Sequence, residues 1–67
     1  MKFQVTNRLT NEIKGFDNPY LLKGEILKIT DNNIYEAESV FEWATTPAVG
    51  SFKYNGEGFD ILIIGQN

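Results

Sequence analysis

The chain has neither cysteine nor histidine, and this double absence constrains its fold more than any other feature of the sequence. With 67 residues, it lies near the lower size limit for a domain that a hydrophobic core alone can stabilise. Disulfides and structural zinc sites, which strengthen many small domains, need thiol or imidazole groups. We therefore expect a single domain over residues 1–67 that is stabilised by apolar burial, by favourable local sequence or by a partner.

Hydrophobic residues are numerous enough for such a core. They make up 42% of the chain, and the aromatic residues are Phe3, Phe16, Tyr20, Tyr35, Phe41, Trp43, Phe52, Tyr54 and Phe59. This composition is typical of a globular chain and not of a disordered one. The longest apolar run, residues 61–64, is too short to cross a bilayer, and residues 1–6 contain no signal-peptide core. We expect a cytoplasmic protein.

The charges argue against direct binding to nucleic acid. The net charge is −3, and the six basic residues are scattered along the chain, so they form no stripe that could release phosphate counterions. Nine carboxylates are also too few for the dense acidity of a DNA mimic. The membrane and nucleic acid are therefore not expected as partners.

Alternating hydrophobic residues predict strands at both ends of the chain. Residues 2–9 alternate, with Phe3, Val5 and Leu9 on one side. Residues 10–20 are rich in breakers and predict a long loop, and residues 21–30 predict a second strand in which Ile26 faces away from Leu27. Near the end, residues 51–54 and 59–64 flank an Asn-Gly pair, which predicts a β-hairpin.

Residues 33–45 carry the helical signal. The apolar residues recur at helical spacing and are Ile34, Ala37, Val40, Phe41 and Ala44. Asn33 can cap the first turn, and Glu36, three residues later, can complete a capping box. Pro47 ends the helix, because the residue before a proline avoids the helical region.

These elements predict an α+β fold of ββαβ order. We expect a small, mainly antiparallel sheet of three to four strands with one α-helix packed across one face. One helix can cover only one face of a sheet, so the other face contacts water or another molecule. We expect Ile26, Leu62 and Ile64 on that uncovered face.

The residues that most catalytic sites need are missing. Without histidine, a serine nucleophile such as Ser39 or Ser51 has no imidazole base. Glu38 and Glu42 lie one helical turn apart, but a solvated helix face explains this spacing more simply than a carboxylate pair. Residues 31–33 resemble half of a calcium loop that lacks the later glycine and glutamate. We expect no catalytic residues, no cofactor and no metal, and hence no enzyme.

The predicted helix carries the residues that we expect to contact a partner, which are Tyr35, Glu36, Glu38, Glu42 and Trp43. The glutamates give the helix a negative outer face that would steer a basic partner, although they can also serve solubility alone. Trp43 lies away from the centre of the apolar stripe and has two interpretations. It either packs against the chain that turns back at residues 47–49 or anchors a partner; Tyr20 is a further candidate contact.

The same region resembles a known family. Asn33-Ile34-Tyr35-Glu36-Ala37, Glu42-Trp43, Pro47-Ala48 and the nearby Gly50 and Phe52, together with Lys2-Phe3, resemble the short early protein by which some podoviruses inhibit host RNA polymerase. The similarity covers about half the chain, mainly the helix and the segment after it. The chain departs from the family in two ways. Its loop at residues 10–22 is longer, and Asp60 is the one charged residue of its last strand.

The resemblance implies a three-stranded sheet with a crossing helix, no catalysis, and binding to the largest polymerase subunit near its downstream DNA channel. The protein would then act in the cytoplasm of the host cell as a phage-type inhibitor that occludes a host protein. Anti-CRISPR proteins, anti-restriction proteins and antitoxins of this size would look similar. The other alternative is a structural or assembly protein that forms a homo-oligomer through the uncovered sheet face.

Overall fold

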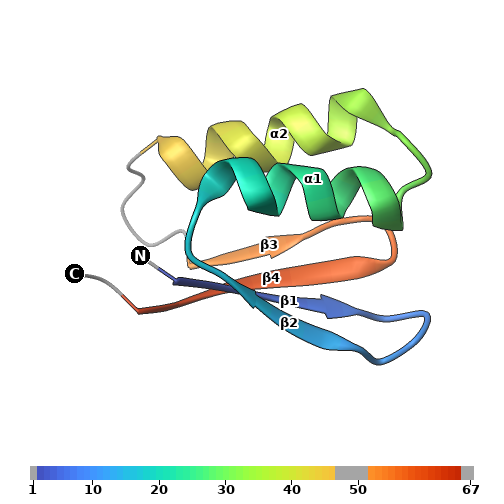
Figure 1. Ribbon diagram of the computed structural model, residues 1–67, viewed down its shortest axis with the longest axis horizontal. Helices are drawn as coiled ribbons and strands as arrows, with labels where there is room; N and C mark the ends of the chain where they lie inside the picture. Colours follow the sequence, from blue (N-terminus) through green and yellow to red (C-terminus); the bar gives the residue numbers. More distant parts are fainter. Residues whose placement is uncertain (1, 47–51, 66–67) are drawn as a thin grey trace.

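Two helices lie side by side on one face of a four-stranded antiparallel sheet in the computed structural model, which describes residues 2–46 and 52–65 (Figure 1). The strands are β1 (Lys2–Asn7), β2 (Ile13–Phe16), β3 (Lys53–Asn55) and β4 (Phe59–Gly65). The helices are α1 (Pro19–Ile29) and α2 (Ile34–Thr45). The order across the sheet is β2-β1-β4-β3, so the first and last strands form its centre.

The α+β class and the strands at both ends of the chain are confirmed. In β1, Phe3 and Val5 are buried, but Leu9 lies beyond the strand and is 80% exposed. The strand ends at Asn7, whose side-chain oxygen accepts hydrogen bonds from the backbone N–H groups of Leu9 and Thr10 at 2.9 and 3.3 Å. This local turn takes the chain out of the sheet.

The hairpin near the end of the chain is also confirmed. β3 pairs with β4 in antiparallel register, with Asn55 opposite Asp60. The Gly56 N–H donates to the Phe59 carbonyl at 2.9 Å, and Gly58 has a positive φ of 85°, which a glycine adopts without steric cost. Of the strand expected over residues 51–54, Ser51 lies outside the described residues.

The strand predicted over residues 21–30 is wrong, because this segment forms helix α1. Asn18 caps the helix by accepting a hydrogen bond from the Tyr20 N–H at 2.7 Å, and Pro19 occupies the first turn, where its missing N–H costs nothing. Leu22 and Ile26, four residues apart, are both buried, whereas Leu21 is 63% exposed. The described residues therefore form two helices in ββααββ order instead of one helix in ββαβ order.

The loop predicted over residues 10–20 contains a strand. β2 pairs with β1 in antiparallel register, with Phe3 opposite Phe16. The segment has only four residues and includes Gly15, so its own sequence favours a strand weakly. Pairing with β1 stabilises it, as does an ion pair at 3.4 Å between Lys14 Nζ and Glu25 Oε2 on α1.

The helix predicted over residues 33–45 is confirmed as α2, and the side-chain oxygen of Asn33 caps it by accepting from the Glu36 N–H at 3.1 Å. Asp31 and Asn32 precede it with positive φ angles of 57° and 65°, and this turn lets α2 run back alongside α1 (Figure 1). The helix ends at Thr45, and Pro47 lies outside the described residues.

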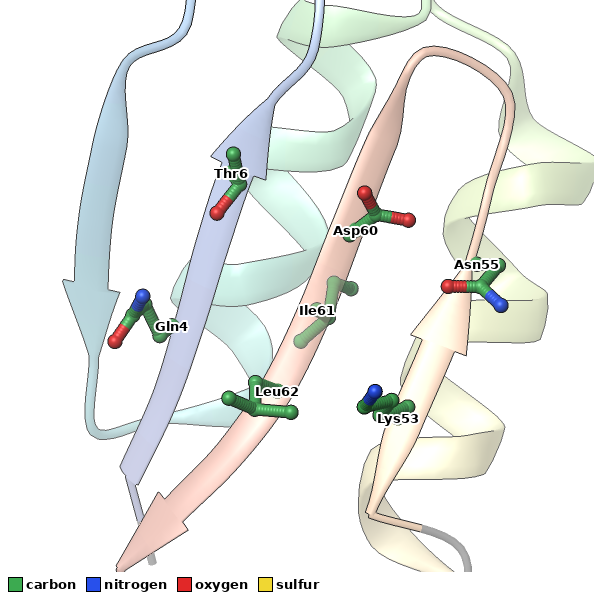
Figure 2. Close-up of a pocket in the computed structure, with 7 residues that line it drawn as sticks. All are labelled: Gln4, Thr6, Lys53, Asn55, Asp60, Ile61 and Leu62. Atoms are coloured by element: carbon green, nitrogen blue, oxygen red, sulfur yellow. The ribbon is translucent and has the colours of Figure 1, made fainter.

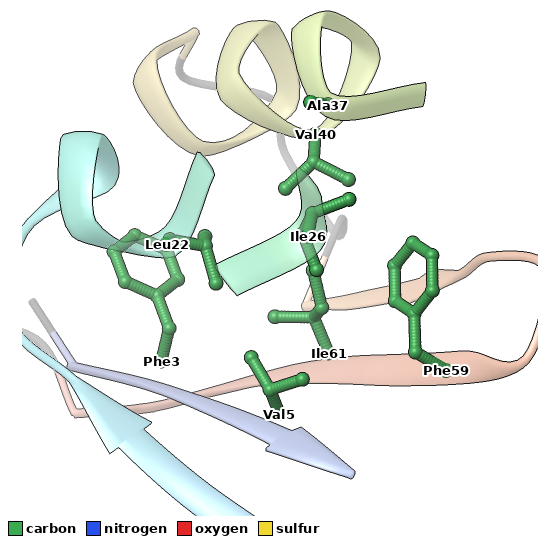
Figure 3. Packing of buried hydrophobic residues seen from close by; sticks show 8 residues of the cluster. All are labelled: Phe3, Val5, Leu22, Ile26, Ala37, Val40, Phe59 and Ile61. Atoms are coloured by element: carbon green, nitrogen blue, oxygen red, sulfur yellow. The ribbon is translucent and has the colours of Figure 1, made fainter. Parts of the chain in front are cut away.

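The core lies between the two helices and the sheet (Figure 3). Its buried residues are Phe3, Val5, Leu22, Ile26, Ala37, Val40, Phe59 and Ile61. Each of the large side chains contributes about 1.5–3 kcal/mol through burial. Ile26 is fully buried on the helix side of the sheet, so its expected place on the uncovered face is wrong. Among the described residues, no helix has the length and apolar character needed to span a membrane.

Candidate functional site

The outer surface of the helix layer brings together acidic and aromatic side chains. We call this set the helix surface; it comprises Tyr20 and Lys23 from α1 and Tyr35, Glu38, Phe41 and Glu42 from α2. On α2, Tyr35, Glu38 and Glu42 are three and four residues apart and therefore lie on one side of the helix. Tyr35 is 88% exposed, which is the highest exposure among the large hydrophobic residues described.

Glu38 and Glu42 border a shallow groove of about 400 Å³ between the helices, which Lys23, Phe41 and Thr45 also line. The Tyr20 and Phe41 rings pack against each other with centroids 5.0 Å apart. Lys23 Nζ lies 5.4 Å from the centre of the Phe41 ring, a cation–π contact. The groove thus combines an aromatic floor with two carboxylates and one internal cation.

The end of α2 adds to the negative potential of this groove. The last turn of the helix contains Glu42 and no basic residue. The carbonyl end of a helix carries a partial negative charge, which a cation stabilises and a carboxylate does not. A positively charged group from another molecule would therefore be favoured at this end of the helix surface.

Glu36 and Trp43 do not belong to the helix surface. Glu36 is half-buried and accepts a hydrogen bond from the Tyr54 hydroxyl at 3.3 Å. The Asn33 N–H donates to the Thr30 hydroxyl oxygen at 3.3 Å, so Glu36 does not complete the predicted capping box. The Trp43 ring packs between Phe3 and Tyr54, with centroid distances of 6.1 and 5.5 Å. Of the two interpretations of Trp43, the structure favours the core position, although residues 47–49, against which we expected it to pack, lie outside the described residues.

The fold alters the acidity of the Tyr54 phenol, whose pKa is raised. Burial of the phenol raises its pKa, and the negative charge of Glu36 raises it further, while a hydrogen bond with Ser39 opposes them. Each main cause disfavours the phenolate. Tyr54 thus stays a neutral hydrogen-bond donor to Glu36 and links strand β3 to helix α2.

The second surface is the face of the sheet that the helices leave uncovered. We call it the open sheet face; its residues alternate with the core residues of their strands and are Lys2, Gln4, Thr6, Ile13, Lys53, Asn55, Asp60, Leu62 and Ile64. Figure 2 shows the side chains from β1, β4 and β3 standing on this face, with the helices behind the sheet. They surround a shallow hollow of about 240 Å³. Asp60 forms an ion pair with Arg8 at 3.7 Å.

The sequence predicted the α2 part of the helix surface correctly in its geometry, since Tyr35, Glu38 and Glu42 share one exposed side. It did not predict the contribution of α1, because Tyr20 and Lys23 were assigned to a loop and a strand. The pair Asn18-Pro19 was the signal that could have revealed this helix, since it supplies a cap followed by a first-turn proline. Phe41 was assigned to the apolar stripe, but it is half-buried and forms the groove floor.

Within residues 2–46 and 52–65, no three Asp or Glu side chains cluster in a way that could hold a metal ion. What the helix surface offers is shape, negative charge and aromatic contact. Comparisons with known protein families, with characterised proteins and with solved structures find no match to this chain.

Proposed function

We propose that this protein is a non-catalytic inhibitor of the phage type, which binds a basic surface of a host protein through its helix surface and occludes it. The observation that carries the proposal is the position of Tyr35. Its ring is 88% exposed and lies on the same side of α2 as Glu38 and Glu42. Tyrosines in such positions are common anchors of protein interfaces, because their rings bury a large area with little loss of conformational freedom.

The two kinds of side chain have different roles in this proposal. Tyr35 and Tyr20, which is 73% exposed, supply the apolar contact that contributes most of the affinity. Glu38 and Glu42 attract a basic partner and raise the association rate, an effect that falls with ionic strength. Lys23 limits the negative charge of the groove, so the partner's cation is best placed over the last turn of α2.

Bacterial RNA polymerase is the first target that we propose, with action in the cytoplasm of the host cell. This choice depends on the resemblance described above, which is concentrated in the sequence of α2. The resemblance implied three strands and one crossing helix, whereas residues 2–46 and 52–65 form four strands and two helices. CRISPR effectors, restriction enzymes and toxins are the alternative targets, and the same helix surface would bind them.

Affinity purification from bacterial lysate followed by mass spectrometry tests the proposal. The comparison needs the native chain, a Tyr35→Ala variant and a double variant, Glu38→Lys with Glu42→Lys. The matched control is Glu12→Lys with Glu57→Lys, which makes the same change of net charge at exposed residues outside the helices. We expect the native chain and the control to retain a stoichiometric partner that both helix-surface variants lose.

Transcription assays with purified components then identify the target. If RNA polymerase is the partner, the native chain and the control inhibit transcription by the purified enzyme, and the Tyr35→Ala variant loses most of this inhibition. Full inhibition by the helix-surface variants would overturn the assignment of the surface. Absence of any stoichiometric partner would contradict the proposed function itself.

A further inference from the structure

We infer that the open sheet face binds a second copy of this chain and forms a symmetrical back-to-back dimer. The inference is independent of the proposed function, since it concerns the opposite side of the molecule. Both helices pack on one face of the sheet, so the other face has no covering layer among the described residues (Figure 1).

The open sheet face has an apolar strip along the central strand β4. Leu62 is half-buried and Ile64 is 50% exposed, and both lie on β4. Lys53 on β3 lies directly opposite Leu62, and Gln4 on β1 lies opposite it on the other side. Leu62 is therefore flanked by polar side chains at the centre of the face (Figure 2).

The charges on this face identify a second copy as the occupant. Lys53 and Asp60 lie on adjacent strands in diagonal positions, two residues apart in the register. In a two-fold interface, if residue i contacts residue j, then j also contacts i. A face that carries both signs of charge around an apolar centre can therefore satisfy itself, with Lys53 of each copy over Asp60 of the other.

The helix surface differs in this respect, because Glu38 and Glu42 dominate it and its one cation already lies over Phe41. Two such surfaces would repel each other, so the helix surface requires a partner of opposite charge. The open sheet face carries Lys2 and Lys53 against Asp60, but the diagonal placement of Lys53 and Asp60 lets the lysine of each copy pair with the aspartate of the other. Among the described residues Lys53 makes no ion pair, so its ammonium group is available to a second copy.

The geometry allows both ion pairs at once. Diagonal neighbours on adjacent strands have side chains about 7–8 Å apart, and packed sheets lie about 10 Å apart. A two-fold axis in the plane between the sheets, passing near Leu62 and between the two charges, places Lys53 over Asp60 and Leu62 beside its own symmetry copy. Arg8, 3.7 Å from Asp60, would border the interface and strengthen its positive side.

Such a dimer has a consequence for binding. The helix surfaces of the two copies point outward on opposite sides, so one dimer presents two copies of the helix surface. The face is small and half polar, so we expect weak self-association with a dissociation constant of about 10–100 µM.

Charge reversal with mixing tests the dimer. Sedimentation equilibrium of the native chain between about 10 and about 500 µM should show a monomer that becomes a dimer. The single variants Lys53→Glu and Asp60→Lys should each stay monomeric, because each places like charges together at two sites of the symmetrical interface. An equimolar mixture of the two variants should form a dimer, since every contact in the mixed pair again joins opposite charges.

The double variant Glu38→Lys with Glu42→Lys is the control, and it should dimerise like the native chain because it changes only the helix surface. A native chain that stays monomeric over the whole range overturns the inference and leaves the face to solvent or to another partner. Charge-reversal variants that dimerise as strongly as the native chain also overturn the inference. Asp60→Lys removes the ion pair with Arg8, so circular dichroism must show that it folds; if it does not, Lys53→Glu decides the question.

Discussion

The Trp43 indole packs against the Tyr54 phenol ring with centroids 5.5 Å apart, and this contact joins helix α2 to the edge strand β3. Phe3 lies on another side of the same indole at 6.1 Å, so Trp43 also contacts the centre of the sheet. Tyr54 in turn stacks on Phe59 at 6.1 Å with ring planes 8° apart. These aromatic contacts connect the core with β3, a strand of only three residues.

Replacement of Trp43 should therefore destabilise the fold. We expect Trp43→Ala to lower the free energy of unfolding by about 3 kcal/mol, because it removes the ring that bridges β1 and β3. Trp43→Phe should cost only about 1 kcal/mol, since it keeps an aromatic ring and removes a buried N–H that has no acceptor among the described residues. Urea unfolding measures both; equal losses would contradict the packing explanation.

Two glycines should respond in opposite directions to replacement by alanine. Gly24 lies exposed inside α1, and a Cβ atom there would meet nothing within 4 Å, so Gly24→Ala should stabilise the protein by about 0.5–1 kcal/mol. At Gly56, a Cβ atom would overlap the buried Phe59 ring, so Gly56→Ala should cost about 2 kcal/mol or more. Thermal unfolding of the pair checks the prediction, and a stable Gly56→Ala protein would show that the turn can rearrange.

The cap of α2 should contribute measurably to stability. Asn33→Ala removes the acceptor of the Glu36 N–H and should cost about 1 kcal/mol, whereas Asn33→Asp keeps a capping oxygen and should stay within about 0.5 kcal/mol of the native chain. Chemical denaturation of the two variants gives the comparison. A loss of the same size in both would mean that the amide group of Asn33 has a further role.

The raised pKa of Tyr54 predicts how stability changes at alkaline pH. In the unfolded chain this phenol ionises near pH 10, whereas the fold holds its pKa higher, so the folded state keeps the proton longer. Its contribution is fully present below about pH 10 and is lost as the pH rises through the folded pKa. Tyr54→Phe should therefore reduce the fall in stability above about pH 10, as measured by urea unfolding at several pH values. An unchanged slope would contradict the linkage.

Tyr35→Ala should separate binding from folding. The side chain is 88% exposed, so its loss should change the free energy of unfolding by less than about 0.5 kcal/mol. Binding to the partner should weaken at least about tenfold, as expected for an aromatic anchor of an interface. Titration calorimetry with the purified partner gives the second number. A variant that unfolds more easily would show that Tyr35 supports the fold.

The sequence by itself determined the elements whose signals are local. The alternation of Phe3 and Val5, the Asn-Gly turn of the final hairpin, and the helical spacing after the Asn33 cap each depend on neighbouring residues, and the structure has all three. The exposed row of Tyr35, Glu38 and Glu42 follows from the same periodicity. These features need only the geometry of a single helix or strand.

Tertiary structure decided the rest. Residues 21–29 contain apolar residues at both strand and helix spacing, and the helix prevailed because it is capped by Asn18 and buries Leu22 and Ile26 against the sheet. Strand β2 exists because β1 offers it a hydrogen-bonding edge, although Gly15 and Lys14 favour a strand weakly. The groove between α1 and α2, the core position of Trp43 and the ion pair between Arg8 and Asp60 all join residues distant in the chain. These features arise from packing between separate segments, so the sequence of a single segment does not predict them.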